Sequence, residues 1–272
     1  MLGDANISAS EWSWLDEGSA ADIECRAAPI QVAIIRSVLG AIEGIDVVVQ
    51  PAADREKKLL VADMDSTMIG QECLDELADY AGIKPEVAAI TERAMRGELD
   101  FAASLKERVA LLKGLDEAVI THCLKERVRP NPGAEILVRT MRRRGAMTLL
   151  VSGGFTAFAE PVARMIGFER VVANRFGCSG GALDGTIEGA IVDAEAKCMA
   201  LEAARKELGV ASPAVLAIGD GANDKAMIEA AGLGVAYRAK PALAAVADAR
   251  LDHNPLDVLL WAQGIPRSEW VA

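Results

Sequence analysis

The chain has 272 residues, of which 51% are hydrophobic and 25% are charged, and its formal net charge is −11. This composition is typical of a globular protein with a sizeable core, and at about 150 residues per domain the length suggests roughly two units. The negative charge argues against a nucleic-acid-binding protein, which usually presents a basic patch, and no apolar run approaches the ~18 residues of a membrane-spanning helix.

The sequence contains five cysteines and two histidines. No two cysteines form a C-x-x-C pair, so we expect reduced thiols in a cytoplasmic protein. The N-terminus has no basic segment followed by an apolar one and is not interpreted as a secretory signal. Because histidines are scarce, we expect carboxylates to be the working groups if the protein is an enzyme.

Residues 1–55 predict a small β-α-β accessory module. Residues 21–27 have the composition of a short strand, residues 29–44 show helical apolar spacing up to a terminal glycine, and residues 45–50 predict a second strand. A unit of this size is too small to fold well alone. We therefore expect it to pack on the rest of the chain or to pair across a homodimer.

Further along, short apolar runs alternate with longer amphipathic stretches. The runs predict strands over 58–65, 146–154, 170–176, 214–221 and 233–238, and their continuous apolar character favours a parallel sheet covered on both faces. The predicted covering helices are 132–144, 156–166, 194–208 and 223–231. Pro161 requires the second of these to begin near residue 160 or to kink, and the Gly-rich segment 178–189 predicts a β-hairpin.

The interval 68–130 contains no strand-like run. Its predicted helices cover 72–81, 85–96, 101–113 and 116–127. We therefore predict an α/β protein in which residues 56–67 and 131–272 form a Rossmann-like parallel-sheet core. Residues 68–130 form a helical cap domain inserted into that core.

Polar residues gather after the predicted strands, where ligands bind in an open parallel sheet. In chain order they are Asp63, Asp65, Ser152, Gly153, Lys197, Asp220, Asn223 and Asp224. The carboxylates suit a hard cation such as Mg²⁺, an amide-rich turn suits an anion, and lysine adds a positive charge. Each group alone also fits a turn, a helix cap or a solvated side chain, but together they indicate phosphoryl transfer.

These motifs resemble those of a known family. DMDST (63–67), VSGG (151–154), Lys197 and GDGAND (219–224) resemble, in order and spacing, the four motifs of the haloacid dehalogenase superfamily. DMDSTMIGQE (63–72) and the segment 94–115 further resemble its phosphoserine phosphatase branch. The resemblance covers roughly residues 56–253.

The resemblance implies hydrolysis of O-phospho-L-serine, the last step of serine biosynthesis, through an aspartyl-phosphate. Asp63 would attack phosphorus, while Asp65 would protonate the seryl oxygen and later deprotonate water. Mg²⁺ would lie between the Asp63 carboxylate, the Asp65 backbone carbonyl and Asp220. The remaining core residues would hold the phosphate or support the metal and the lysine, namely Ser152, Gly153, Lys197, Asn223 and Asp224.

Substrate choice is expected to lie in the cap. By the same resemblance, Glu72 would bind the ammonium group of phosphoserine and Arg108 its carboxylate. Met95 and Phe101 match apolar residues that close the pocket. Helical Glu and Arg also fit solvent-facing positions, and Met and Phe also fit a core.

Two other functions remain open from the sequence. A phosphotransferase would pass the phosphoryl group from Asp63 to another alcohol such as homoserine, with the same residues. A non-catalytic amino-acid sensor is the third alternative, although the intact acidic and lysine motifs argue against it. Many bacterial relatives in this branch carry a longer N-terminal regulatory region that often resembles ACT domains, and residues 1–55 match about half of such a unit.

Overall fold

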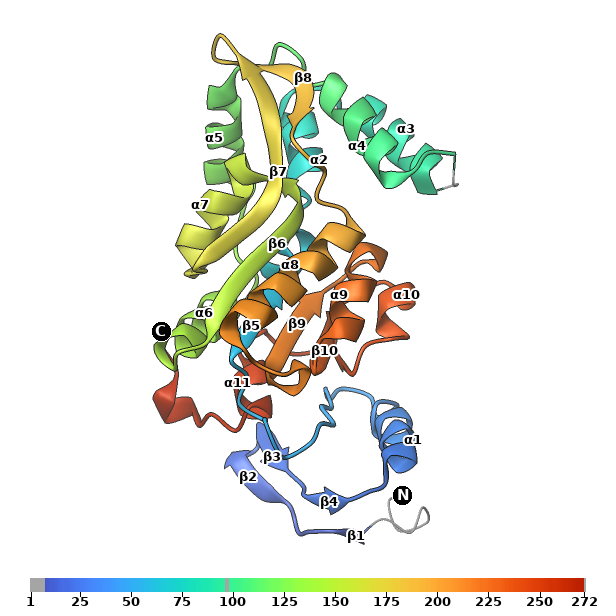
Figure 1. The fold of residues 1–272 in the computed structure, drawn as a ribbon, viewed down its shortest axis with the longest axis vertical. Helices are drawn as coiled ribbons and strands as arrows, with labels where there is room; N and C mark the ends of the chain where they lie inside the picture. The colour runs from blue at the N-terminus through green and yellow to red at the C-terminus, as the bar shows by residue number, and fades with distance from the viewer. Residues whose placement is uncertain (1–7, 96–97, 272) are drawn as a thin grey trace.

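The computed structural model describes residues 8–95 and 98–271, and a seven-stranded sheet lies at its centre (Figure 1). The sheet has the order β11-β10-β9-β5-β6-β7-β8, and its pairs are parallel except β7 with β8. Its strands are β5 (Leu59–Ala62), β6 (Met147–Phe155), β7 (Arg170–Ser179), β8 (Ala182–Glu188), β9 (Val215–Gly219), β10 (Leu233–Tyr237) and β11 (Ala249–Leu251).

The central strand β5 shows why helices cover both faces. Its four residues are fully buried and belong alternately to two apolar clusters, because successive side chains of a strand point to opposite faces. One cluster includes side chains of α6 (Ala134–Arg143), α7 (Thr156–Ile166) and α11 (Val258–Ala262). The other includes α8 (Ala194–Leu208), α9 (Lys225–Ala230) and α10 (Pro241–Ala244). The predicted parallel sheet covered on both faces is therefore confirmed.

Four helices fill the interval between β5 and α6, and Figure 1 shows them at the upper end of the molecule. They are α2 (Cys73–Tyr80), α3 (Lys84–Met95), α4 (Phe101–Ala110) and α5 (Glu117–Arg127). Backbone hydrogen bonds attach this group to the β7–β8 hairpin, from Gly114 N to Leu183 O (2.8 Å) and from Leu183 N to Leu115 O (2.9 Å). The helices are thus attached to the β7–β8 edge of the sheet.

The hairpin predicted over 178–189 is present, and its first strand is the outer half of β7. Gly180 and Gly181 form the turn with φ of +63° and +84°. Two consecutive residues with positive φ suit the twist of a tight hairpin, and glycine adopts this conformation without steric strain.

The N-terminal region differs from the predicted β-α-β unit. Two antiparallel ribbons form instead, one of β1 (Ser8–Ala9) with β4 (Cys25–Arg26) and one of β2 (Ser13–Asp16) with β3 (Ala20–Asp22). Helix α1 (Pro29–Leu39) ends before Gly40, earlier than the predicted end at Gly44. The strand predicted over 21–27 is therefore split between β3 and β4.

The strand predicted over 45–50 is wrong. Within this segment Val48 forms an isolated antiparallel bridge to Ala249, but no ladder follows. Its polar side chains bind the C-terminal region instead. Asp46 accepts hydrogen bonds from the backbone amides of residues 252–254, and Gln50 Nε2 donates to Ala262 O (2.6 Å). These contacts fix the segment as an irregular connection against the core.

Two smaller predictions also change. Helix α7 begins at Thr156 and continues through Pro161, so it does not start at residue 160. The helix predicted over 223–231 is a short 3₁₀ turn, Ala222–Asp224, followed by α9. In the described part of the chain, none of the helices combines the length and apolar character needed to cross a membrane.

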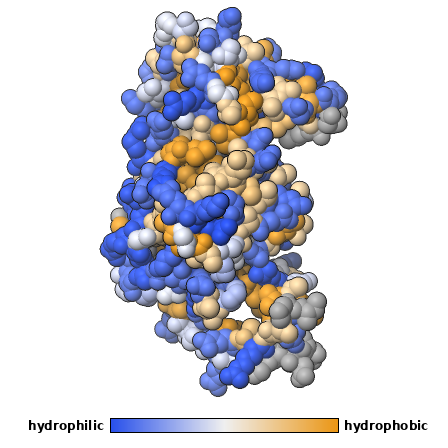
Figure 2. Space-filling view, viewed as in Figure 1, coloured by the Kyte–Doolittle hydropathy of each residue, from blue (hydrophilic) through white to orange (hydrophobic). Residues whose placement is uncertain are grey.

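Exposed apolar side chains concentrate in the N-terminal region. Among the described residues, seven of the eleven exposed large hydrophobic side chains lie between Trp12 and Ile45. Figure 2 shows hydrophobic residues in this lower part of the molecule beside hydrophilic surface. The N-terminal region is thus less fully packed than the sheet, whose central strands are completely buried.

Candidate active site

A pocket of about 120 Å³ lies between the carboxyl ends of the central strands and the cap helices. Figure 2 shows the surface indented between the arm formed by α3 and α4 and the core below it. The core side of the pocket is lined by Asp63, Asp65, Ser152, Gly153, Gly154, Phe155, Asp220, Asn223 and Lys240. The other side is lined by Glu72, Leu74, Asp75, Phe101, Leu105 and Arg108. The structure therefore brings nine of the predicted site residues to one cavity.

Asp63 lies directly after β5, where the chain leaves the sheet. Its Oδ1 atom accepts a hydrogen bond from Met64 N (2.8 Å), and its own backbone N–H is held by Ile218 O (3.0 Å). The next turn, Met64–Met68, is wide and irregular, with Ser66 at a φ of +53°. This turn carries Asp65 back toward the pocket, so both aspartates line the same cavity.

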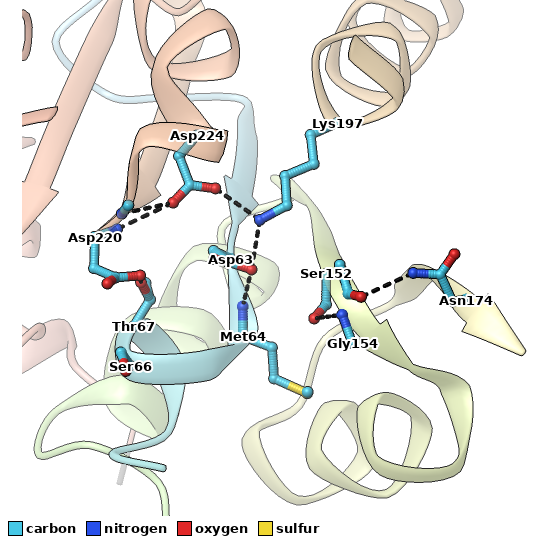
Figure 3. A network of polar contacts seen from close by, with 12 residues as sticks. Asp63, Met64, Ser66, Thr67, Ser152, Gly154, Asn174, Lys197, Asp220 and Asp224 are labelled. Carbon is cyan, nitrogen blue, oxygen red and sulfur yellow. Dashed lines mark hydrogen bonds and ion pairs between the residues drawn. The ribbon is translucent and has the colours of Figure 1, made fainter. Parts of the chain in front are cut away.

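Lys197 and Asp224 lie behind the pocket and are both fully buried. The Lys197 ammonium is 2.8 Å from Asp63 Oδ1 and 2.7 Å from Asp224 Oδ1 (Figure 3). Burial by itself lowers the pKa of Lys197, but the two carboxylates outweigh it and the net effect is a raised pKa. The lysine is therefore charged at neutral pH. Among the described residues, these two carboxylates engage two of its three N–H donors, which leaves the third for a ligand.

The other Asp224 oxygen accepts hydrogen bonds from Asp220 N (3.2 Å) and Gly221 N (3.1 Å). Asp224 thus fixes the loop after β9 as well as the lysine. Burial, and then the charge of Asp224, raise the pKa of Asp220 to about 6. Thr67 Oγ1 lies 3.4 Å from Asp220 Oδ1 and supports it weakly.

Asp65 is partly buried, and its Oδ1 atom is enclosed without a hydrogen-bond partner among the described residues. Burial, and then the charge of Glu72, raise the pKa of Asp65 to about 7. Near neutral pH such a carboxyl group can exist in both protonation states. This property suits a general acid that later becomes a base.

The carboxylates form a cluster that fits a divalent cation. Oxygen atoms of Asp63, Asp220 and Asp224 lie within 4.8 Å of one another, and all three residues are buried. Both oxygens of Asp224 are already engaged by the lysine and by backbone amides. Asp63 and Asp220 therefore remain as the carboxylates with oxygens available to a metal. Crowded buried carboxylates favour a hard cation with oxygen ligands.

Ser152 and Gly153 lie where β6 bends at the pocket. Gly154 N donates to Ser152 Oγ (2.9 Å), so the hydroxyl hydrogen is left to point elsewhere. A methyl group added at Gly154 would lie 3.0 Å from Ser152 Oγ and 3.4 Å from Asp65 Oδ2. The backbone of this loop thus lies next to the Asp65 carboxyl group.

The predicted cap residues lie opposite this loop. Glu72 Oε1 accepts a hydrogen bond from Ser66 Oγ (2.6 Å). Arg108 Nε donates weakly to Ser104 O (3.4 Å), and burial lowers the pKa of Arg108. A methyl group at Gly153 would lie 3.2 Å from Phe101 Cζ, so the cap touches the loop. Met95 ends α3, but its side chain lies outside the described part of the structure.

Several residues at the site were not predicted from the sequence, and two of them, Lys240 and Asn174, bind predicted site residues directly. Lys240 lines the pocket, and its backbone N donates to Asp220 O (2.9 Å) while its Nζ is 3.9 Å from Asp220 Oδ2. Lys240 lies shortly after the end of β10, and a polar residue at such a strand end is the signal that could have found it. Asn174 is buried within β7 and contacts Gly153. Its place directly after the apolar stretch 171–173, within a predicted strand, was the signal for it.

The mostly parallel sheet, the helices α2–α5 and the buried aspartates around one lysine form an α/β fold with a polar pocket at the carboxyl ends of its strands. The chain belongs to the haloacid dehalogenase-like hydrolase family, whose model matches residues 60–229. This family membership and fold were predicted from the four motifs and are confirmed.

Individual relatives are also similar to this chain. Phosphoserine phosphatase SerB2 of Mycobacterium tuberculosis is 45% identical over 243 residues, which cover 89% of this chain and 59% of that protein. A phosphoserine phosphatase of Archaeoglobus fulgidus is 43% identical over 215 residues, covering 78% of this chain and 62% of that protein. The match thus spans less than two thirds of the length of either relative.

A solved structure described as a phospho-aspartyl intermediate analogue of phosphoserine phosphatase has the same fold. It superimposes with a TM-score of 0.69 at 38% identity and covers 76% of this chain and 99% of that chain.

Proposed function

We propose that this protein hydrolyses O-phospho-L-serine to L-serine and phosphate. One observation carries the proposal: the pocket has Asp63 on its core side and both Glu72 and Arg108 on its cap side. A phosphomonoester with its phosphate at Asp63 would present its other charges to the cap. The carboxylate of Glu72 suits an ammonium group, and Arg108 suits a carboxylate through two parallel hydrogen bonds. The relatives named phosphoserine phosphatase support this substrate.

In the first step, Asp63 attacks phosphorus as the bond from phosphorus to the seryl oxygen breaks. Asp65 gives its proton to that oxygen, and serine leaves. The Ser152 hydroxyl, the Gly153 amide and the free N–H of Lys197 hold the phosphoryl oxygens and stabilise their charge. The step leaves an aspartyl-phosphate at residue 63 and an ionised carboxylate at residue 65.

In the second step, Asp65 takes a proton from water, and the water oxygen attacks phosphorus. The bond between phosphorus and Asp63 breaks, which releases phosphate and restores the carboxylate. Asp65 is again protonated, so the cycle closes without another proton donor. Phe101, in contact with Gly153, helps to keep other water molecules from the phosphoryl group.

Mg²⁺ is the cation that we propose for the carboxylate cluster. Asp63, Asp220 and the backbone carbonyl of Asp65 would hold it, and Asn223 and Asp224 would support the loop around it. When bound, Mg²⁺ would offset the repulsion between the Asp63 carboxylate and the phosphate oxygens. Asp224 would keep its contacts with Lys197 and the amides of the loop.

A trapping experiment tests the proposal. Phosphoserine is mixed with the enzyme and Mg²⁺, quenched, and reduced with tritiated borohydride, which expels the phosphate and converts an acyl phosphate at residue 63 into labelled homoserine. We expect this product at residue 63 and stoichiometric release of serine and phosphate. Turnover that persists in Asp63→Asn would reject the mechanism.

The same assay separates the alternative functions. With homoserine added, a phosphorylated acceptor in place of free phosphate would identify a phosphotransferase. Binding of serine without turnover in the wild-type protein would identify a sensor. Unchanged release of phosphate supports the hydrolase.

A further inference from the structure

The loop carrying Ser152 and Gly153 interrupts the pairing between β6 and β7. Val151 is paired with Val172, but the next pair is Phe155 with Asn174, so β6 advances by four residues while β7 advances by two. The two extra residues form a bulge at the pocket. Bulges bend a strand and leave part of its ladder unpaired, so other groups must hold the backbone there.

Asn174 pairs with Phe155 where the ladder resumes after this bulge, and it is only 1% exposed. Its Nδ2 donates to Gly153 O (2.8 Å), and its Oδ1 accepts from Val192 N (2.8 Å). Figure 3 draws the first of these hydrogen bonds as a dashed line from Asn174. One partner is a carbonyl and the other an N–H group. The amide orientation of Asn174 is therefore fixed by its neighbours.

The first contact acts on a single peptide group. The carbonyl of Gly153 and the N–H of Gly154 belong to the same planar unit. Asn174 holds the carbonyl, and the N–H donates to Ser152 Oγ (2.9 Å). The orientation of this peptide therefore decides which way the Ser152 hydroxyl can donate.

The second contact reaches the helix that carries the lysine. Val192 precedes the first residue of α8 by two positions and Lys197 by five. Its carbonyl also lies 3.6 Å from the position of a methyl group on Gly153. Asn174 thus ties the Ser152–Gly154 loop to the entry of α8. These two elements carry Ser152, Gly153 and Lys197, the groups that we propose to bind the phosphoryl oxygens.

We infer that Asn174 is a positioning residue for phosphoryl binding. It holds the peptide between Gly153 and Gly154 so that the Ser152 hydroxyl, which accepts from Gly154 N, faces the substrate. The inference rests on the proposed function, because it takes this loop to be the phosphate-binding element. A leucine of similar size could fill the same space, but it would leave Gly153 O and Val192 N without a partner.

Two substitutions separate positioning from simple packing. Asn174→Asp keeps an acceptor for Val192 N but places an oxygen against Gly153 O. Asn174→Ser is neutral and removes both contacts, so it controls for the negative charge that Asn174→Asp adds. It also tests the inference if Asn174→Asp does not fold. Thr140→Val is the matched control. Thr140 is equally buried, and its hydroxyl accepts from Val271 N (2.9 Å) at the C-terminal end of the chain.

The probe is inorganic phosphate, titrated calorimetrically into each full-length protein in the presence of Mg²⁺. The kcat and KM for phosphoserine and the thermal midpoint are measured on the same samples. We expect both Asn174 variants to bind phosphate about tenfold or more weakly, as for the loss of a hydrogen bond to an anion-binding group, and to lose kcat. Thr140→Val should lower the thermal midpoint without changing phosphate affinity.

The inference would be overturned if Asn174→Ser kept its phosphate affinity and kcat within twofold of the wild-type values. An impairment of Asn174→Asp alone would then be explained by its added negative charge. An equal loss of affinity in Thr140→Val would also overturn it, since general destabilisation would explain the result. If the wild-type protein bound no phosphate at all, the proposed function would fail together with the inference. The titration of the wild-type protein therefore distinguishes failure of the proposed function from failure of the inference about Asn174.

Discussion

The ammonium nitrogen of Lys197 lies 2.8 Å from Asp63 Oδ1, and the two side chains are only 1% and 7% exposed. The same nitrogen lies 2.7 Å from Asp224 Oδ1. One buried ammonium group therefore forms ion pairs with two buried carboxylates. This arrangement fixes the Asp63 side chain at the pocket.

Replacement of this cation should destabilise the fold as well as abolish activity. Lys197→Met leaves Asp63 and Asp224 buried and uncompensated, and breaking a buried ion pair costs roughly 3–5 kcal/mol. Urea denaturation of the metal-free protein measures this loss. The double variant Lys197→Met, Asp224→Asn should regain part of the stability but no activity. An unchanged urea midpoint in the single variant would contradict the prediction.

Asp65→Asn should separate the two chemical steps. An amide cannot protonate a seryl oxygen, so turnover of phosphoserine should fall by about 10²–10⁴-fold, the usual contribution of general acid–base catalysis. With p-nitrophenyl phosphate the leaving group needs no proton. Rapid mixing should then show a burst of p-nitrophenol followed by slow turnover, because the base for the water is missing. Absence of the burst would argue against this role.

Arg108→Ala should affect substrate choice more than chemistry. The variant loses the group proposed for the carboxylate of phosphoserine, so kcat/KM for phosphoserine should fall far more than that for p-nitrophenyl phosphate. Lys106→Ala, at an exposed position on the same helix, is the control and should change neither. Equal losses on both substrates would remove Arg108 from the specificity role.

Asp220→Asn should weaken metal binding. The substitution removes one negative charge from the buried carboxylate cluster, and changes around a metal site typically cost about 10–100-fold in affinity. The Mg²⁺ concentration for half-maximal activity and the calorimetric affinity of the metal-free protein should shift together. Glu229→Gln, exposed on α9, provides the comparison. Identical metal affinity in Asp220→Asn and wild type would exclude Asp220 as a ligand.

Asp46→Ala tests how the N-terminal segment is held. The Asp46 carboxylate accepts hydrogen bonds from the backbone amides of Asp252, His253 and Asn254, at 2.8, 3.2 and 2.9 Å. Its removal should lower the free energy of unfolding by about 1–2 kcal/mol with little change in kcat. Glu43→Ala, at an exposed position nearby, should have no such effect. A fall in kcat without a fall in stability would disagree with an anchoring role.

The amino-acid sequence by itself determined the elements whose residues follow one local period. The helix predicted over 194–208 matches α8 at both ends, because Asp193 caps its first turn and Gly209 ends it at a φ of +65°. The continuous apolar runs likewise specified a parallel sheet. Since the carboxyl ends of such strands share one edge, the sequence predicts Asp63, Ser152 and Asp220 at a common pocket.

Only the tertiary structure decided which groups support that pocket and how the N-terminal region is attached. Asn174 meets Val192, 18 residues away, and Asp46 meets Asn254, 208 residues away. Residues 45–50 have the composition of a strand, but their contacts with the C-terminal region give them an irregular conformation instead. The physical reason is that a periodic pattern reports which face of an element is buried, whereas a hydrogen bond between distant residues depends on the packing of whole elements and leaves no local trace.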